Sequence, residues 1–471
     1  MTVDPRTPVL VGAGTVVQRD LALDAAGLMR EAAARAEVDA GAPGLVAAAR
    51  LVLVPRGTWK DADPGRTVCP AAHSVLAALG VLQTTLIERA CSAIAAGQVD
   101  VAVVVGGEAK WRERALGASG APGAPADGGV PDETLTPDGM IISREEIDAR
   151  LVSAVSQYAL IENARRAADG QSVETHAVTI AGLWERFNQV AGTNPDAWNP
   201  EPMTASTIAE AGPSNRMLAW PYNKWHNPQW NVDQAGALIF CSASAAEAFG
   251  VPTDRWVFPS VIAWSDHMVP VSRRASIHRS PGFSLAAPLI GDVGGVDHMD
   301  LYSCFPIAVR TQALELGLPL ERELTVTGGM TFAGGPLNNY VLQSMAAMAH
   351  VLRADAGSRG LVTAISGLIT KQGVSVWSTS PPPDGYQAVN LSLAAAEATP
   401  VVGAAAPQPG PASIVTYTVL PEGRVVIVAD AAAGGRAVAA LEDGTLAASM
   451  MASEWCGRPV HLDGAGGFSP A

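Results

Sequence analysis

Short apolar runs and longer amphipathic segments alternate along the first hundred residues. Apolar runs of seven to nine residues that end in Gly or Pro are typical of strands buried on both faces. The segments between them are rich in Ala, and their apolar residues recur every three or four positions, which favours helices. This rhythm predicts an α/β fold. The expected strands are 8–14, 49–55, 72–80 and 99–107, and the expected helices are 22–38 and 82–97.

The same rhythm returns in the second half of the chain. Two α/β halves in one chain predict a duplicated, layered α-β-α-β-α architecture, with halves at 1–111 and 256–380. The strands expected in the second half are 257–264, 297–303, 324–329, 360–366 and 374–379, and the helices are 304–316 and 337–353.

Residues 112–255 differ from both halves and are expected to form an inserted helical cap over the site. The stretch GASGAPGAPADGGVPD at 117–132 has the composition of a flexible, low-complexity loop. Helical spacing follows at 144–169 and 173–190. The Trp-rich stretch MLAWPYNKWHNPQW comes after these helices.

The C-terminal part reads as a separate β domain at 386–471. The stretch STSPPPDG at 378–385 is a proline-rich hinge of the kind at which domains part. Beyond it, SIVTYTVL, RVVIVAD, RAVAALEDG and GRPVHLDG read as short strands. Five or six strands in roughly 85 residues predict a small antiparallel, OB-like β-barrel.

Composition narrows the classes of function. The 471 residues carry a formal net charge of −14 and no Lys/Arg-rich block, which argues against nucleic acid as a partner. An anionic ligand would need a local basic pocket. We find neither a basic-then-apolar leader nor an apolar run of membrane-spanning length, so we expect a cytoplasmic protein. The wide spacing of the five Cys and eight His argues against disulfides and metal sites.

Two motifs are more simply explained by structure than by chemistry. The stretch GAGTVV at 12–17 has Val17 where a dinucleotide fingerprint needs its third Gly, so we expect a tight β-to-α turn. Cys91 lies inside the expected helix 82–97 and shares a stripe with Ile87 and Ile94. An activated thiolate is favoured at a helix N-terminus, so Cys91 is expected to be a buried structural thiol.

Four stretches together resemble the thiolase superfamily, which makes or breaks carbon–carbon bonds in CoA thioesters. They are IERACSAIAAGQVDVAVVVGGEA, VDHMDLYSCFP, LTVTGGMTFAGGPLNNY and GLVTAISGLITKQGVSVWS, in the family's order and spacing over roughly residues 5–380. The chain looks most like actinobacterial thiolase-like proteins that have an extra C-terminal β-barrel and are commonly labelled acetyl-CoA acetyltransferases. The resemblance implies the thiolase fold, acyltransferase ancestry, a role in lipid metabolism and coenzyme A as part of the substrate, with no tightly bound cofactor.

The resemblance also shows which reactive groups are missing. The family's nucleophilic Cys position falls on Gly80, and its activating His position falls on Gly335. Its Cys-x-Gly region reads Ile365-Ser366-Gly367, and its Asn-Glu-Ala-Phe loop reads Tyr302-Ser303-Cys304-Phe305. Acyl transfer through a cysteine is therefore not expected. We also expect the two glycines to leave an enlarged cavity.

Tyr302, Cys304 and Ser366 remain as catalytic candidates at these positions. The Tyr302 phenol could donate a hydrogen bond to a developing enolate, or it could be a packed aromatic residue at a strand end. Cys304 opens the expected helix 304–316, where its thiol would be acidic, or it is a small packing residue. Ser366 lies near the family's acid/base position, and Lys371 beside it is expected to be a solvated turn residue.

The binding candidates implied by a CoA ligand are cations for phosphates and aromatic faces for adenine. Arg216, Lys224, Trp220, Trp225 and Trp230 supply both types in the cap. The alternative is a cap whose tryptophans pack on the body of the protein.

Asn338 and Asn339 follow Pro336 at the expected start of a helix. Their amides would either cap that helix or point into the pocket.

Three functions stay open at this stage. The chain could bind a CoA thioester and carry out C–C bond cleavage or acyl transfer through an enolate, without a covalent intermediate. It could be a non-catalytic acyl-CoA-binding or scaffold protein. It could also be a conventional acetyl-CoA acetyltransferase, against which the missing residues argue. An acyl-CoA is the expected partner in each case, and a homodimer is a further expectation.

Overall fold

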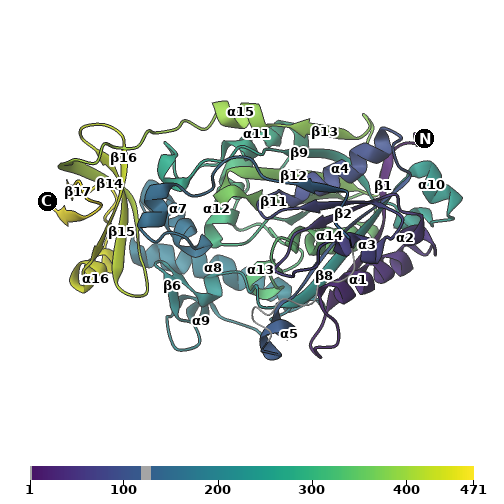
Figure 1. The fold of residues 1–471 in the computed structure, drawn as a ribbon, viewed down its shortest axis with the longest axis horizontal. Coiled ribbons are helices and arrows are strands. Elements are labelled where there is room, and N and C mark those ends of the chain that lie inside the picture. Colours follow the sequence, from purple (N-terminus) through teal and green to yellow (C-terminus); the bar gives the residue numbers. More distant parts are fainter. Residues whose placement is uncertain (1–2, 118–128) are drawn as a thin grey trace.

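The structure, a computed structural model, describes residues 3–117 and 129–471. Most of the stretch expected to be a low-complexity loop, residues 118–128, lies outside the described residues. Two mixed sheets with helices around and between them form the larger part of the molecule, and a separate antiparallel β unit lies at one end (Figure 1). Within the described ranges, no helix is both long enough and apolar enough to span a membrane.

The first sheet has six strands in the order β1-β8-β4-β2-β3-β5. β8 runs antiparallel to β1 and β4, whereas β4, β2, β3 and β5 are parallel neighbours. β8 falls inside 112–255, the range expected to be the cap, yet it lies in this sheet between β1 and β4. The strands are β1 (Pro8–Val17), β2 (Leu51–Pro55), β3 (His73–Ala77), β4 (Val101–Ala109), β5 (Glu133–Leu135) and β8 (Asp233–Ser242).

The second sheet has five strands in the order β10-β11-β12-β9-β13. β11 and β12, the strands expected at 360–366 and 374–379, pair antiparallel along their whole lengths. The strands are β9 (Phe258–Trp264), β10 (His298–Asp300), β11 (Arg359–Ser366), β12 (Lys371–Ser378) and β13 (Gln387–Asn390). β13 comes after the proline-rich hinge, so the chain returns to this sheet before it leaves for the C-terminal unit.

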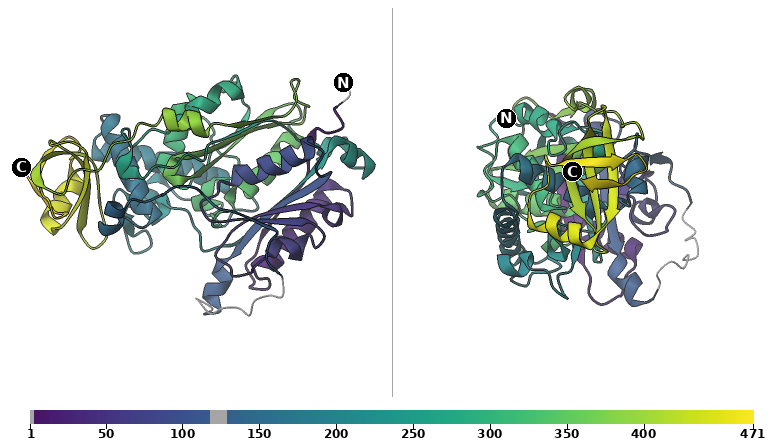
Figure 2. Two further views of the ribbon diagram at one scale, coloured as in Figure 1. Left: turned by 45° about the horizontal axis from the view of Figure 1, so that its top comes forward. Right: turned by 90° about the vertical axis from the view of Figure 1, so that its left-hand side faces the viewer.

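Helices complete five layers, as the sequence pattern predicted. α4 (Gln83–Ala95) and α14 (Tyr340–Ala354) lie between the two sheets. α1 (Ala25–Ala40) covers the outer face of the first sheet, and α11 (Pro281–Ile290) with α12 (Pro306–Leu316) covers that of the second (Figure 2). The short helices are α2 (Leu45–Ala48), α3 (Pro64–Val68), α5 (Lys110–Ala115), α10 (Ala243–Ala248), α13 (Gly329–Phe332) and α15 (Ser392–Glu397).

The glycines of GAGTVV serve helix packing and not a turn. β1 continues to Val17, so the expected β-to-α turn at 12–17 is wrong. A Cβ on Gly12 would lie 2.2 Å from the carbonyl oxygen of Ala36, and one on Gly14 would lie 2.3 Å from that of Ala32. These distances are too short for any side chain, so the two glycines let α1 approach the strand closely.

The expected strand at 324–329 is also wrong, and a buried carboxylate explains the difference. Asp300 at the end of β10 accepts hydrogen bonds from the backbone N–H groups of Val326 and Thr327, at 3.0 and 3.2 Å. The hydroxyls of Thr325 and Thr327 donate to the same carboxylate. Because these amides are bonded to a side chain, they are not available to a neighbouring strand.

The cap is built from helices α6 to α9 and a short hairpin. The single helix expected at 144–169 is two helices, because Arg150 has a left-handed backbone (φ 67°) and Ser153 caps a new helix through Ser156 N–H. The elements are α6 (Arg144–Asp148), α7 (Ala154–Ala168), α8 (Val173–Ala191), α9 (Ala205–Ala209), β6 (Met217–Ala219) and β7 (Tyr222–Asn223).

The C-terminal unit is a five-stranded antiparallel sheet in the order β16-β15-β14-β17-β18. Its edges approach each other, since Ala440 N–H on β16 donates to the carbonyl of Gly466 just before β18. Figure 2 shows the curled sheet end-on. The elements are β14 (Pro409–Val419), β15 (Arg424–Ala431), β16 (Arg436–Glu442), α16 (Gly444–Ala452), β17 (Pro459–Asp463) and β18 (Phe468–Pro470).

A polar contact joins the C-terminal unit to the cap. Arg166 on α7 is buried and pairs with Glu454 at 3.0 Å. The same guanidinium donates to the hydroxyl of Tyr417 on β14, and Asn163 Nδ2 donates to the Tyr417 carbonyl at 2.7 Å. Buried charges and amides keep this geometry because leaving any of them unpaired would be costly.

A second buried cluster joins the cap to the second half. The Glu162 carboxylate on α7 accepts hydrogen bonds from Arg310 on α12 and from the Tyr222 hydroxyl on β7, and His176 Nε2 on α8 lies 3.0 Å away. Burial by itself raises the pKa of Glu162, but Arg310 and His176 outweigh it and lower the pKa from 4.5 to about 2.

We predict that Glu162→Gln lowers the free energy of unfolding at pH 7 by about 3–5 kcal/mol, because Arg310 loses its buried counter-charge. The folded pKa is depressed, so this stabilisation is complete above pH 4.5 and fades as the pH falls towards 2. Urea unfolding at pH 7 and at pH 3 measures both effects. Glu31→Gln, in an exposed pair with Arg35, is the control and should change stability little. A cost below about 1 kcal/mol at pH 7 would contradict the prediction.

Candidate functional site

The position of the family nucleophile is a packed turn between β3 and α4. Gly80 has a left-handed backbone (φ 95°), and a Cβ there would lie 3.1 Å from Pro137 Cγ. Its carbonyl accepts hydrogen bonds from Lys371 Nζ at 3.0 Å and from Ser366 Oγ at 3.3 Å. The second sheet therefore holds this turn in place through two side chains.

Lys371 is not the solvated turn residue that the sequence suggested. It begins β12 and is 1% exposed, and its Nζ lies 3.3 Å from Asp266 Oδ1. A buried ammonium requires such partners. The Gly80 carbonyl and Asp266 supply them, so Lys371 fixes the turn that carries the nucleophile in thiolases.

The Gly335 position is filled as well. A Cβ on Gly335 would lie 3.0 Å from Pro228 Cβ and 3.3 Å from Met330 Cβ. The expectation that the two glycines leave an enlarged cavity is therefore wrong, because prolines from the neighbouring loops occupy the space beside both.

Tyr302 is held by its backbone at the end of β10. Its N–H donates to Thr363 Oγ1 and its carbonyl accepts from Gln312 Nε2, both at 2.8 Å. Its ring packs edge-on against Tyr340, with the centroids 6.0 Å apart. Burial raises the pKa of the phenol far above its ordinary value, although Gln83 beside it acts in the opposite direction. Tyr302 therefore stays protonated at neutral pH and can donate a hydrogen bond but not accept a proton as a base.

Cys304 is not an acidic thiol at a helix start. α12 begins at Pro306 with Phe305 as its N-cap, so Cys304 precedes the helix that was expected to begin at residue 304. Burial raises the pKa of the Cys304 thiol to about 12.

Cys91 lies inside α4 with 0% exposure, as predicted, and burial raises its pKa well above the ordinary range.

Asn338 and Asn339 do not cap α14 with their side chains. Asn338 has a left-handed backbone (φ 56°), accepts from Gln83 Nε2 at 3.0 Å and donates to the Arg56 carbonyl at 3.2 Å. Asn339 is buried, and its side chain faces the backbone of Gly106. Both amides face the interior between α4, α14 and the strand ends.

A Trp-rich cleft of 950 Å³ opens between the cap, helix α5 and the loop that follows α8. Phe305, the last residue of the 302–305 loop, forms part of its wall. The cleft therefore touches the loop that faces the substrate in thiolases. Its aromatic and basic lining consists of Trp111, Trp198, Trp225, Trp230, Arg114, Arg216 and Lys224.

The charge of this Trp-rich cleft contrasts with that of the whole chain. Arg114, Arg216 and Lys224 line it, and among the described residues no Asp or Glu does. Lys224 Nζ lies 4.3 Å from the ring centroid of Trp225. Three cations without a described acid in the lining form a local patch of positive charge in a chain of net charge −14.

Four of the five cap residues proposed from the sequence line this cleft, and Trp220 does not. Trp220 stacks on Tyr417 of the C-terminal unit at 5.4 Å, and the Arg166 guanidinium lies 4.8 Å from its ring. Sequence reasoning missed Trp111 and Trp198, which lie far from the Trp-rich stretch in sequence. Their aromatic residue type was the only feature of the sequence that could have indicated a place in the cleft.

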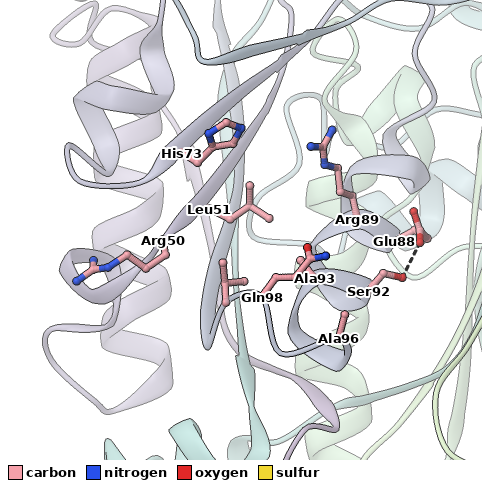
Figure 3. A pocket seen from close by; sticks show the side chains of 10 residues that line it. Arg50, Leu51, His73, Glu88, Arg89, Ser92, Ala93, Ala96 and Gln98 are labelled. Atoms are coloured by element: carbon pink, nitrogen blue, oxygen red, sulfur yellow. Dashed lines mark hydrogen bonds between the residues drawn. The ribbon is translucent and has the colours of Figure 1, made fainter.

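Another cavity of 490 Å³ lies between α4 and the starts of β2 and β3 (Figure 3). Its cations are already engaged, since Arg89 pairs with Glu133 and Arg50 donates to the carbonyls at the end of α2. Figure 3 shows Arg50 directed away from Arg89 across the gap. Both arginines of this cavity are therefore bonded to groups of the protein itself.

Comparisons with known proteins agree on the architecture. No protein-family model and no curated protein matches the chain. A monomeric SCP2-thiolase-like protein type 1 from Mycobacterium smegmatis is 28% identical over 99% of both chains, with a TM-score of 0.83. An Ltp2–ChsH2(DUF35) aldolase is 18% identical over 80% of this chain and 99% of its own, at 0.59. The acetyl-CoA acetyltransferase from Syntrophomonas wolfei is 16% identical over 79% and 99%, at 0.57.

The chain has a thiolase-like fold. The likeness to the Mycobacterium smegmatis protein extends over 99% of both chains and so includes the C-terminal β unit. The aldolase and the acetyltransferase match about four fifths of this chain while being almost fully covered themselves. The remaining fifth of this chain has no counterpart in these two structures.

We predict that the thiols of this thiolase-like protein resist alkylation while it is folded. Burial raises the pKa of Cys69, Cys241 and Cys304 to about 12, and it raises those of Cys91 and Cys456 as well. Iodoacetamide at pH 8 should label the native protein at least a hundredfold more slowly than the urea-unfolded protein, because thiolate is the reactive form. Mass spectrometry over time measures this, with unfolded protein as the control that labels fully. Fast labelling of Cys91 or Cys304 in the native protein would contradict it.

Proposed function

We propose that this thiolase-like protein binds a CoA thioester in the Trp-rich cleft and does not carry out acyl transfer through a cysteine. The observation that carries the proposal is the cleft itself, where three cations and four tryptophans meet with no described acid in the lining. Cations suit the phosphates of CoA, and an indole face suits its adenine. The contact with Phe305 would direct the thioester end towards the 302–305 loop.

The missing groups support the second part of the proposal. Gly80, Gly335 and the stretch 365–367 provide neither the cysteines nor the histidine of the thiolase pattern. A side chain at Gly80 would press against Pro137, and one at Gly335 would press against Pro228. Both loops are therefore packed around glycine. Purified protein should therefore show no thiolytic cleavage of acetoacetyl-CoA.

The cytoplasmic location and the homodimer stay predictions, and the similar Mycobacterium smegmatis protein is described as monomeric.

We predict that Arg216→Ala combined with Lys224→Ala weakens CoA binding at least tenfold. Each side chain is expected to contribute a charge-assisted contact of about 1.5–3 kcal/mol to the phosphates. Calorimetry with CoA measures the affinity. Arg50→Ala, in the cavity of Figure 3, removes a cation outside the cleft and should leave binding unchanged. Undetectable binding of millimolar CoA to the wild type would reject the proposal, as would equal affinity in the double variant.

A second candidate function adds chemistry to this binding. Tyr302 stays protonated and lies three residues before Phe305, so its hydroxyl suits a donor to the enolate of a CoA thioester. Such a donor would allow C–C bond cleavage without a covalent intermediate. The aldolase among the structural neighbours shares the fold only, at 18% identity.

For this second function we predict that Tyr302→Phe abolishes turnover while changing CoA affinity less than twofold. The substitution removes one hydroxyl and keeps the ring that packs against Tyr340. A screen of β-hydroxy- and β-ketoacyl-CoA thioesters by mass spectrometry would first identify the substrate. The matched control is Tyr158→Phe, which removes the hydroxyl of another buried tyrosine and should retain turnover. Turnover that survives Tyr302→Phe would reject the catalytic role. A wild type that binds CoA but converts no thioester would favour the binding function alone.

A further inference from the structure

A further cavity of 490 Å³ lies between α14, the end of β1 and the loop 193–196 that follows α8. Its described lining shares no residue with the Trp-rich cleft. Tyr340, Gln343, Ala347 and His350 recur every three or four residues, so one face of α14 forms a wall of this cavity. Much of the remaining lining consists of Thr, Asn and Gln side chains, and no described Lys or Arg belongs to it. The cavity is therefore polar, and its volume is that of a small-molecule site.

The carboxylate of Asp196 carries the negative charge of this wall. Thr15, also in the lining, donates its hydroxyl proton to Asp196 Oδ2. The neighbouring Arg255 and Arg353 do not neutralise Asp196, because both pair with Asp39 instead, at 3.4 and 2.6 Å. Asp196 therefore has a hydroxyl as a partner but no ion pair among the described residues.

His350, on the α14 side of the cavity, does not supply the missing positive charge. Burial lowers its pKa below the ordinary value of 6.5, while Asp39 and Asp196 act in the opposite direction. The ring is therefore neutral at pH 7. The effect of Asp196 on His350 also shows that the carboxylate lies close to this second residue of the wall, as it does to Thr15.

The loop that carries Asp196 is held in place from both sides. Asn194 Nδ2 donates to the Thr327 carbonyl at 2.8 Å, and Asn194 Oδ1 accepts from the Asp196 N–H at 2.9 Å. Gln234 Nε2 on β8 donates to the Asp196 carbonyl at 3.2 Å and to the Ala333 carbonyl at 2.9 Å. The acid is therefore fixed in the wall before a ligand arrives, which lowers the entropic cost of binding.

These groups define the charge and the shape of the ligand. A carboxylate without a counter-charge, among neutral oxygens and in a chain of net charge −14, favours a cation. A metal ion is a poor fit, since no group of three or more His, Cys, Asp or Glu in the described parts of the chain could hold one. An ammonium group has three N–H donors and no acceptor, which suits a carboxylate surrounded by hydroxyl and amide oxygens. Pro195, Val326 and Ala347 offer apolar surface to an attached alkyl chain.

We propose that this cavity binds a primary alkylammonium ion, whose charged group pairs with Asp196. Its alkyl chain lies against the apolar part of the wall. The same loop contributes Asp196 to this cavity and Trp198 to the Trp-rich cleft, so two cavities of opposite charge lie on either side of it. Binding of the ammonium ion does not require CoA.

The test is a ligand-observed NMR titration of the full chain with n-butylammonium in phosphate buffer. The matched probes n-butanol and butyrate keep a short alkyl chain and replace the cation by a neutral and by an anionic group. We expect saturable binding of n-butylammonium, and binding at least tenfold weaker for the other two probes, which corresponds to about 1.4 kcal/mol. The reason is that only the ammonium group can form a charge-assisted hydrogen bond with the carboxylate.

Three variants locate the site. Asp196→Asn keeps an oxygen for the Thr15 hydroxyl but removes the charge, so it should weaken binding of n-butylammonium at least tenfold. Ala347→Phe fills the cavity from α14 and should abolish binding. Asp384→Asn removes an exposed carboxylate in the proline-rich hinge, outside the cavity, and should bind like the wild type. Thermal unfolding of each variant establishes that it is folded.

Four results would overturn the proposal. They are a wild type without saturable binding of n-butylammonium, equal binding of n-butanol, equal affinity in Asp196→Asn, and displacement of the probe by an equimolar amount of KCl. The last result would mean that the site takes inorganic cations. The comparison of probes needs only the wild type, so it decides the matter even if a variant does not fold.

Discussion

The buried carboxylate of Glu162 fixes the position of the cap, and much of the functional surface depends on it. It is bonded to α12 through Arg310, to the β6–β7 hairpin through Tyr222, and it lies beside His176 on α8. A buried charge tolerates little displacement because each lost partner leaves an uncompensated group. The hairpin leads directly into Lys224 and Trp225, so the same contact positions one wall of the Trp-rich cleft.

The two candidate regions of the thiolase-like protein differ in how they are built. The turn at Gly80 is packed against Pro137 and bonded to Lys371 and Ser366, so the place of the family nucleophile is filled and rigid. The Trp-rich cleft is open and carries positive charge. A nucleotide is recognised by cations and aromatic rings, whereas a nucleophile needs a reactive group with a base beside it. A protein can therefore lack the nucleophile and still have the groups that suit a nucleotide.

Much of the fold could be predicted from the sequence, and the errors have physical causes. Buried strands and amphipathic helices have local hydrophobic patterns, so most strands of the two large sheets and of the C-terminal unit were predicted close to their observed positions. The stretch 324–329 has the apolar pattern of a strand. It fails to form one because Asp300, distant in sequence, takes its backbone amides.

The sequence by itself determined the layered α/β architecture, the burial of Cys91 and the absence of a nucleophile at Gly80. The first two follow from local periodicity, and the third follows from the resemblance to the thiolase pattern. Only the tertiary structure decided that Lys371 is buried, that Trp220 faces the C-terminal unit and that Trp111 joins the cleft. It also placed Cys304 before its helix and raised its pKa. Burial and the partners of a side chain depend on segments far apart in the chain, and no local pattern records which of them meet.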